Sequence, residues 1–107
     1  MKIQMIGMDH SRAPVEIRER FSFTTAGAAT AMEAVCALPG VEGCVLLSTC
    51  NRTELWVSAS GPLDLPRLLC SLKGLDPGEY GGYLVCRADG EAVEYLFALA
   101  SGLRSMI

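Results

Sequence analysis

The residues best suited to chemistry lie in the stretch LLSTCNRTEL, which runs from position 46 to 55. Cys50 follows an apolar run there, and Arg52 and Glu54 come two and four residues after Cys50. A cysteine attacks as its thiolate, which a thiol with a pKa of about 8.5 supplies only in small amount at neutral pH. Partial exposure and a nearby positive charge favour that form, so Cys50 is the candidate nucleophile. The structural alternative is that Cys50 and Asn51 only turn a hairpin, while Arg52 and Glu54 are solvated surface charges.

The other four cysteines have structural explanations. Cys36 and Cys70 lie on or beside apolar helical stripes, and we expect Cys36 to belong to the core; Cys44 and Cys86 lie in expected strands. The count is odd, no two cysteines form a C-x-x-C pair, and no secretory signal begins the chain, so we expect five free thiols. With His10 the only histidine, we expect no metal site.

Hydrophobic periodicity and capping residues predict the elements that would position Cys50. Alternating or β-branched runs predict strands at 2–8, 41–49, 53–59 and 84–87, with Cys50 at the tip of a hairpin. Apolar spacing predicts helices at 14–20, 25–38, 65–73 and from about 91 onward, and it leaves 74–83 as turns.

This order of elements predicts a ferredoxin-like βαββαβ sandwich of the α+β class, with helices on one face of an antiparallel sheet and an added C-terminal helix. An RNA-recognition motif uses the same order, but 53–59 lacks its basic-Gly-aromatic pattern. The net charge of -3 also disfavours a domain that holds nucleic acid alone. No G-x-G-x-x-G motif occurs, so we expect no dinucleotide site in these residues. Neither a secretory signal nor an apolar run of about 18 residues occurs, so we expect a cytoplasmic protein with no membrane contact.

Three stretches carry a resemblance to one known family. GMDHSRAPVEIRERF (7–21), LLSTCNRTELW (46–56) and LFALASGLRSM (96–106) resemble three signatures of glutamyl-tRNA reductase, in the family's order and spacing. The resemblance implies that residues 1–107 form that family's N-terminal catalytic domain, whose fold is ferredoxin-like. It also implies NADPH-dependent reduction of glutamyl-tRNA to glutamate-1-semialdehyde, the first step toward 5-aminolevulinate and tetrapyrroles.

The resemblance assigns roles to particular residues. The family cysteine that matches Cys50 attacks the aminoacyl ester, releases the tRNA and forms a thioester that accepts hydride more readily than an ester does. Thr49, Asn51 and Arg52 match positions that line the glutamate site, and Ser105 matches a further substrate-contacting serine. The Arg52 guanidinium would meet a carboxylate in bidentate fashion.

The resemblance also implies a cofactor, a substrate and protein partners, not all of which these 107 residues would bind. NADPH would be bound by a domain that this chain lacks, glutamyl-tRNA would be the substrate, and the full-length family is homodimeric with glutamate-1-semialdehyde aminomutase as a further partner. The chain stops before the family's Gly-Glu-x-Gln segment, so we expect acylation or ester hydrolysis at most from this fragment. The competing hypotheses are a non-catalytic module that binds the glutamyl-tRNA end and an unrelated interaction domain.

Three positions do not receive a clear role. Tyr95 stands where many family members carry a histidine, and a tyrosine with a pKa of about 10 is a poor proton shuttle. A helical wheel places Val93 on an apolar face with 96, 97, 100 and 103, which turns Tyr95 toward a cleft or solvent. Arg104 replaces a common acidic residue, and His10 lies in the first signature without a catalytic assignment.

Overall fold

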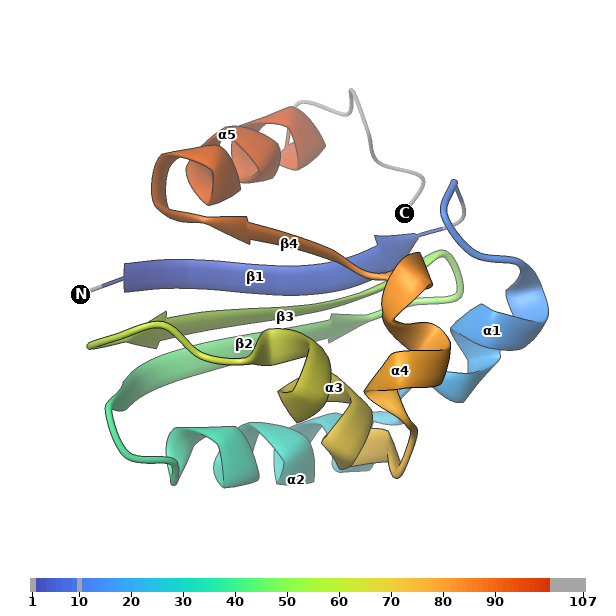
Figure 1. Cartoon of the computed structure of the whole chain (residues 1–107), viewed down its shortest axis with the longest axis horizontal. Helices are drawn as coiled ribbons and strands as arrows, with labels where there is room; N and C mark the ends of the chain where they lie inside the picture. The colour runs from blue at the N-terminus through green and yellow to red at the C-terminus, as the bar shows by residue number, and fades with distance from the viewer. Residues whose placement is uncertain (1, 10, 101–107) are drawn as a thin grey trace.

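The computed structural model describes residues 2–9 and 11–100, without the side chains of residue 9 and residues 96–100 (Figure 1). Within them, one antiparallel sheet has the strand order β2-β3-β1-β4. Its strands are β1 (Lys2–Asp9), β2 (Val41–Ser48), β3 (Arg52–Ala59) and β4 (Val85–Ala88). The predicted α+β class and its antiparallel sheet are confirmed, and each strand begins within one residue of its predicted start.

Helices cover both faces of this sheet. The lower face in Figure 1 carries α2 (Thr25–Cys36) and α3 (Leu65–Lys73), and the upper face carries α5 (Asp89–Ala100). Two short helices, α1 (Val15–Arg20) and α4 (Pro77–Tyr80), lie near one end of the sheet. The added C-terminal helix therefore covers the face that the ferredoxin-like core leaves open.

The alternation of side chains along β3 separates two kinds of packing. Thr53, Leu55 and Val57 point toward α2 and α3, where buried apolar side chains form the main core. Arg52, Glu54 and Trp56 occupy the alternate positions and therefore point toward α5. A polar set of side chains is thus placed between the sheet and α5.

Capping residues fix the helix ends as the sequence predicts. The Thr24 side chain accepts a hydrogen bond from the backbone N–H of Gly27 at 3.0 Å, and Asp64 accepts one from Arg67 at 3.2 Å. Gly74 ends α3 in the left-handed conformation, with φ of 67°. α3 therefore begins and ends where its capping signals place it.

The segment predicted as turns contains two short helices. α4 is followed by a single 3-10 turn, Gly81–Tyr83. The Asp76 side chain accepts from the backbone N–H of Gly78 at 3.1 Å and begins α4, and the buried ring of Tyr80 meets Phe21 edge to face at 5.6 Å. Helices this short show no apolar period, so the turn residues dominated the prediction.

Two further expectations were wrong. Cys36 is exposed, because the buried positions of α2 are Ala31 and Val35 and Cys36 is its last residue. The side chain of Val93 is 40% exposed, and α5 instead packs against the sheet through Ala92 and Tyr95. The helical wheel chose the face with the most apolar residues, whereas the buried Tyr95 ring lies on another face and its hydroxyl bonds to Arg52 and Glu54 in the sheet.

Candidate functional site at the turn between strands 2 and 3

Cys50 lies in the tight turn that joins β2 to β3. The last paired residues are Ser48 and Thr53, and the Thr49 backbone N–H donates to the Arg52 carbonyl at 2.8 Å. The Thr49 hydroxyl oxygen accepts from the backbone N–H of Asn51 and from that of Arg52, each at 3.2 Å. The turn is closed by its own hydrogen bonds, and it holds the Cys50 side chain in an exposed position.

Arg52 and Glu54 are buried, so the structural alternative, in which they are solvated surface charges, is wrong. Each residue is 1% exposed, and Arg52 Nη1 donates to Glu54 Oε2 at 3.0 Å. The same nitrogen donates to the Tyr95 hydroxyl at 3.0 Å, which in turn donates to Glu54 Oε2 at 2.7 Å. Trp56 Nε1 donates to the other carboxylate oxygen at 3.2 Å. We call Arg52, Glu54, Trp56 and Tyr95 the buried polar network.

The network favours a charged arginine and a neutral tyrosine. Burial alone would lower the pKa of Arg52, but the interactions with Tyr95 and Glu54 outweigh it and raise that pKa above its ordinary value. Burial, followed by the hydrogen bond to the Glu54 carboxylate and its charge, raises the pKa of Tyr95 to about 12. Tyr95 is therefore a neutral hydrogen-bond donor near neutral pH and is unsuited to shuttle protons.

Gly7 makes room for the network. It is paired with Glu54 across β1 and β3, and a Cβ at position 7 would lie 2.9 Å from Glu54 Cγ and 2.9 Å from the Thr53 carbonyl oxygen. A glycine inside a strand often marks such a close approach. Gly7 lies in the first signature, so the sequence carried a signal for this contact.

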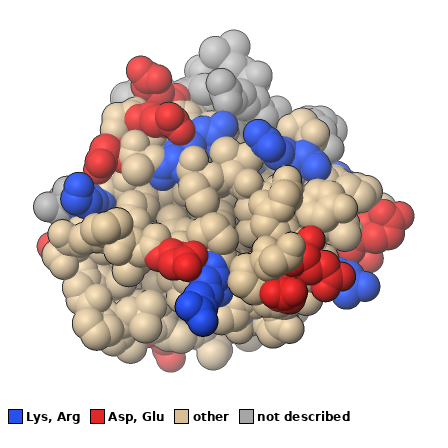
Figure 2. Space-filling model, in the orientation of Figure 1, with Lys and Arg blue, Asp and Glu red and all other residues tan. Residues whose placement is uncertain are grey.

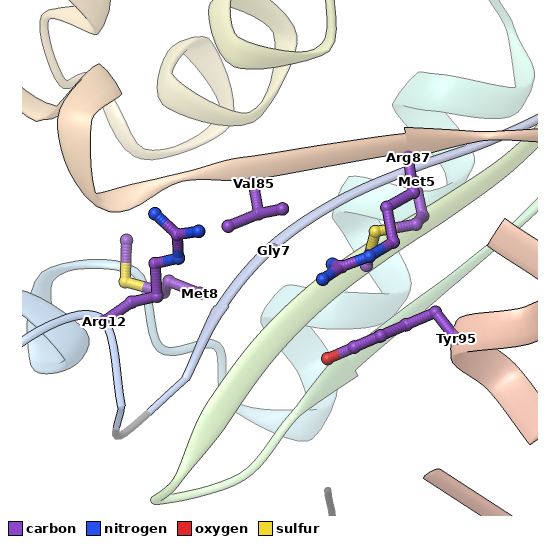
Figure 3. Close-up of a pocket in the computed structure, with 7 residues that line it drawn as sticks. All are labelled: Met5, Gly7, Met8, Arg12, Val85, Arg87 and Tyr95. Atoms are coloured by element: carbon purple, nitrogen blue, oxygen red, sulfur yellow. The ribbon is translucent and has the colours of Figure 1, made fainter. Parts of the chain in front are cut away.

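A hollow of about 200 Å³ opens beside Tyr95, between β1, β4 and the inner side of α5 (Figure 3). Arg12, in the connector after β1, lies at one end, and Arg87 of β4 lies at the other with its guanidinium carbon 4.0 Å from the centre of the Tyr95 ring. The remaining lining residues are uncharged: Met5, Gly7, Met8 and Val85. The side chains that line the hollow are therefore positively charged or neutral.

The surface view agrees with this placement of charge. Figure 2 shows basic side chains in the upper centre of the face, below and to the right of the acidic side chains that lie near the position of α5 in Figure 1. Sequence reasoning did not single out Arg12 or Arg87, because neither belongs to a charge run and only the fold brings β4 beside β1.

The structure brings together part of the predicted site. Thr49, Cys50 and Asn51 share one turn, and Arg52 begins the next strand with its side chain in the buried polar network. Ser105, Arg104 and His10 lie outside the described residues. Among the residues that are described, no three His, Cys, Asp or Glu side chains gather as metal ligands, and none of the five cysteines is in a disulfide. No helix in the described part is long and apolar enough to cross a membrane.

Comparisons with known proteins agree with one family. A family model described as Glutamyl-tRNAGlu reductase, N-terminal domain, matches residues 6–107. The glutamyl-tRNA reductase of Heliobacterium mobile is 37% identical over 111 residues, covering 100% of this chain and 25% of that protein. That of Xanthomonas campestris pv. campestris (strain B100) is 39% identical over 107 residues, covering 100% and 24%.

A solved structure agrees with the fold as well. The glutamyl-tRNA reductase from Methanopyrus kandleri superposes with a TM-score of 0.71 at 32% identity, covering 97% of this chain and 23% of that one. The chain thus spans about a quarter of the length of the relatives it matches. A family model matches nearly all of this chain, and a solved relative shares its fold. The chain therefore belongs to the glutamyl-tRNA reductase family and corresponds to that family's N-terminal domain.

Proposed function

We propose that residues 1–107 form a catalytic domain that takes the glutamyl group from glutamyl-tRNA onto Cys50. The Cys50 sulfur attacks the ester carbonyl, a C–S bond forms, and the C–O bond to the terminal ribose breaks. The ribose oxygen leaves with the proton that the thiol loses. The observation that carries the proposal is the exposed Cys50 on a turn closed by Thr49, in a chain of this family.

The hollow beside Tyr95 is the proposed binding place for the acidic side chain of the glutamyl group. It lies on the sheet face that carries the buried polar network, and it includes Gly7 and Met8 near the Asp9 end of β1, where β1 pairs with Arg52. Arg12 and Arg87 supply positive charge there, and a guanidinium binds a carboxylate through charge-assisted hydrogen bonds. We propose that these two arginines attract the glutamyl carboxylate.

Thr49, Asn51, Arg52 and Ser105 are proposed as further substrate contacts, as the family resemblance suggests. A substrate contact through Arg52 would require its hydrogen bonds to rearrange, because its Nη1 already donates to Glu54 and to Tyr95. A substrate carboxylate would have to displace one of these acceptors or share the guanidinium with it. In the conformation described, Arg52 supports the wall of the hollow.

Hydride transfer is not assigned to these residues. A dinucleotide site typically needs parallel strands whose carboxyl ends face a helix N-terminus, and the described sheet pairs all its strands antiparallel. The fold of residues 2–9 and 11–100 therefore does not fit NADPH. For a protein of the full length of these relatives, we propose the complete reaction to glutamate-1-semialdehyde, a cytoplasmic location, a homodimer and an aminomutase partner.

The deciding experiment tests acylation without reduction. The protein is incubated with glutamyl-tRNA in the absence of NADPH and quenched in acid, and mass spectrometry locates the glutamyl group. We expect a glutamyl adduct on Cys50, its loss in Cys50→Ser, and its retention in Cys86→Ser, a matched control at another exposed cysteine.

Binding without an adduct would favour the second candidate, a module that holds the glutamyl-tRNA end without turnover. That candidate is favoured by Tyr95, because a buried tyrosine with a pKa of about 12 cannot perform the proton transfers available to a histidine. An unchanged rate of glutamyl-tRNA deacylation together with no adduct would exclude the acyl-transfer proposal.

A further inference from the structure

Two cysteine sulfurs meet away from the candidate site. Cys36 is the last residue of α2, Cys44 lies in the middle of β2, and their Sγ atoms are 3.4 Å apart. The Cys44 thiol also lies 3.5 Å from the Met32 carbonyl oxygen, which places it against the inner side of α2. The helix and the strand therefore hold two thiols in direct contact.

The backbone between the two thiols is fixed by hydrogen bonds. The Val41 N–H donates to the Leu38 carbonyl at 3.2 Å, and the Ser60 N–H donates to the Gly40 carbonyl at 2.8 Å. Gly40 has φ of +82°, a conformation that other residues rarely adopt. The turn that brings β2 back beside α2 is therefore tied both to itself and to the chain that leaves β3.

The two thiols differ in access to solvent. Cys36 is exposed, whereas Cys44 is partly buried beneath α2. Burial, followed by the hydrogen bond and charge of Cys36, raises the pKa of Cys44 to about 11, so Cys44 is a protonated thiol near neutral pH. An oxidant from solution would meet Cys36 first, and Cys44 would be the second sulfur.

We propose that Cys36 and Cys44 are a modification site, a dithiol that hydrogen peroxide converts into a disulfide between α2 and β2. The Cys36 thiolate attacks one peroxide oxygen, the O–O bond breaks, and the products are a sulfenic acid and hydroxide, which takes up the proton that the Cys36 thiol lost and becomes water. The Cys44 sulfur then attacks the Cys36 sulfur, the S–S bond forms, the S–O bond breaks, and hydroxide leaves with the Cys44 proton as a second water. The two sulfurs together lose two electrons, which reduce the peroxide.

The reaction requires little movement. An S–S bond is about 2.05 Å long, so the sulfurs approach by about 1.4 Å. Rotation of the exposed Cys36 side chain at the end of α2 can supply that approach. Cys50 lies beyond the far end of β2, where Ser48 pairs with Thr53, so the bond leaves the Cys50 thiol unmodified.

Peptide mapping tests the proposal on the native protein. After a brief exposure to hydrogen peroxide, the remaining thiols are alkylated and the protein is digested, without reduction, by a protease that cleaves after glutamate. Cleavage after Glu33, Glu42 and Glu54 places Cys36 on peptide 34–42 and both Cys44 and Cys50 on peptide 43–54, so the disulfide appears as a crosslinked pair of peptides that a reductant dissolves. Tandem mass spectrometry of this pair then shows whether Cys50 carries the alkyl group and Cys44 the crosslink. We expect this crosslink to form at least about tenfold faster in the folded protein than in denaturant, because folding holds the sulfurs together.

Matched variants identify the partners. Cys36→Ser and Cys44→Ser should each abolish the crosslink, whereas Cys50→Ser and Cys86→Ser should retain it at the original rate. Alkylated Cys36 and Cys44 after peroxide treatment of the folded wild-type protein would overturn the proposal. So would a preferred crosslink from either of them to Cys50 or Cys86, and neither result depends on how well a variant folds.

Discussion

At the scale of single residues, the buried polar network shows how a charged side chain is held under a helix. Arg52 carries its charge into a nearly solvent-free position because the Glu54 carboxylate accepts from Arg52, Tyr95 and Trp56 together. A buried ion pair contributes little net stability over an apolar pair, but removal of one partner leaves the other charge uncompensated. The network therefore positions the side chains more than it stabilises the fold.

Glu54→Gln should destabilise the protein strongly, because the Arg52 guanidinium then stays buried without its counter-charge. We expect the free energy of unfolding to fall by about 3–5 kcal/mol in urea titrations followed by circular dichroism. Glu79→Gln, in the short helix α4, serves as the exposed control and should change it by less than about 0.5 kcal/mol. Equal effects of the two substitutions would contradict the role given to the network.

At the scale of elements, the sequence predicted a strand where the two faces of that strand carry different kinds of side chain. The run 53–59 alternates because Leu55 and Val57 enter the main core, and the caps Thr24 and Asp64 mark their helices. The sequence did not reveal that Arg52 and Glu54 would be buried, because charged side chains are usually exposed and their cover is a helix some forty residues further on. The contact of Arg52 and Glu54 with α5 depends on the folded sheet, because it joins parts of the chain that are distant in sequence.

Gly7→Ala should weaken the contact between β1 and β3. The new Cβ would come within 2.9 Å of the Glu54 side chain and the Thr53 carbonyl oxygen, so one of the two strands must shift. We expect a loss of about 1–3 kcal/mol in the free energy of unfolding, measured by urea titration.

Gly43→Ala is the matched control for this substitution, because it lies in β2 and its Cβ would have no atom within 4 Å. It should be nearly neutral. A loss at position 43 as large as that at position 7 would attribute the effect to glycine in a strand and not to crowding over Glu54.

At the scale of the whole molecule, the hollow beside Tyr95 exists only because distant parts of the chain meet. Arg12 comes from the connector after β1, Arg87 from β4 and Tyr95 from α5. The strand-forming runs on both sides of Cys50 predicted its turn, because these residues are adjacent in sequence. They could not predict the two arginines, whose proximity depends on β4 pairing with β1 at the edge of the sheet.

Arg12→Gln and Arg87→Gln should each slow glutamyl transfer to Cys50 by about tenfold at low substrate concentration, because each removes one charge-assisted contact to the proposed carboxylate. The rate of adduct formation, measured by mass spectrometry over a range of glutamyl-tRNA concentrations, tests this. Arg67→Gln, in α3 on the other side of the sheet, is the charge-matched control and should leave the rate unchanged. Equal slowing by all three substitutions would indicate only general attraction to tRNA.

The tyrosine at position 95 gives the hollow one further property. With the pKa of Tyr95 at about 12 and that of Arg52 raised above its usual value, neither group gains or loses a proton between acidic and mildly alkaline solution. A histidine in the same position would change its charge near neutrality. The inner wall of this hollow therefore presents a tyrosine to a ligand, with the buried Arg52 behind it, and the charge of neither group varies with the acidity of the cell.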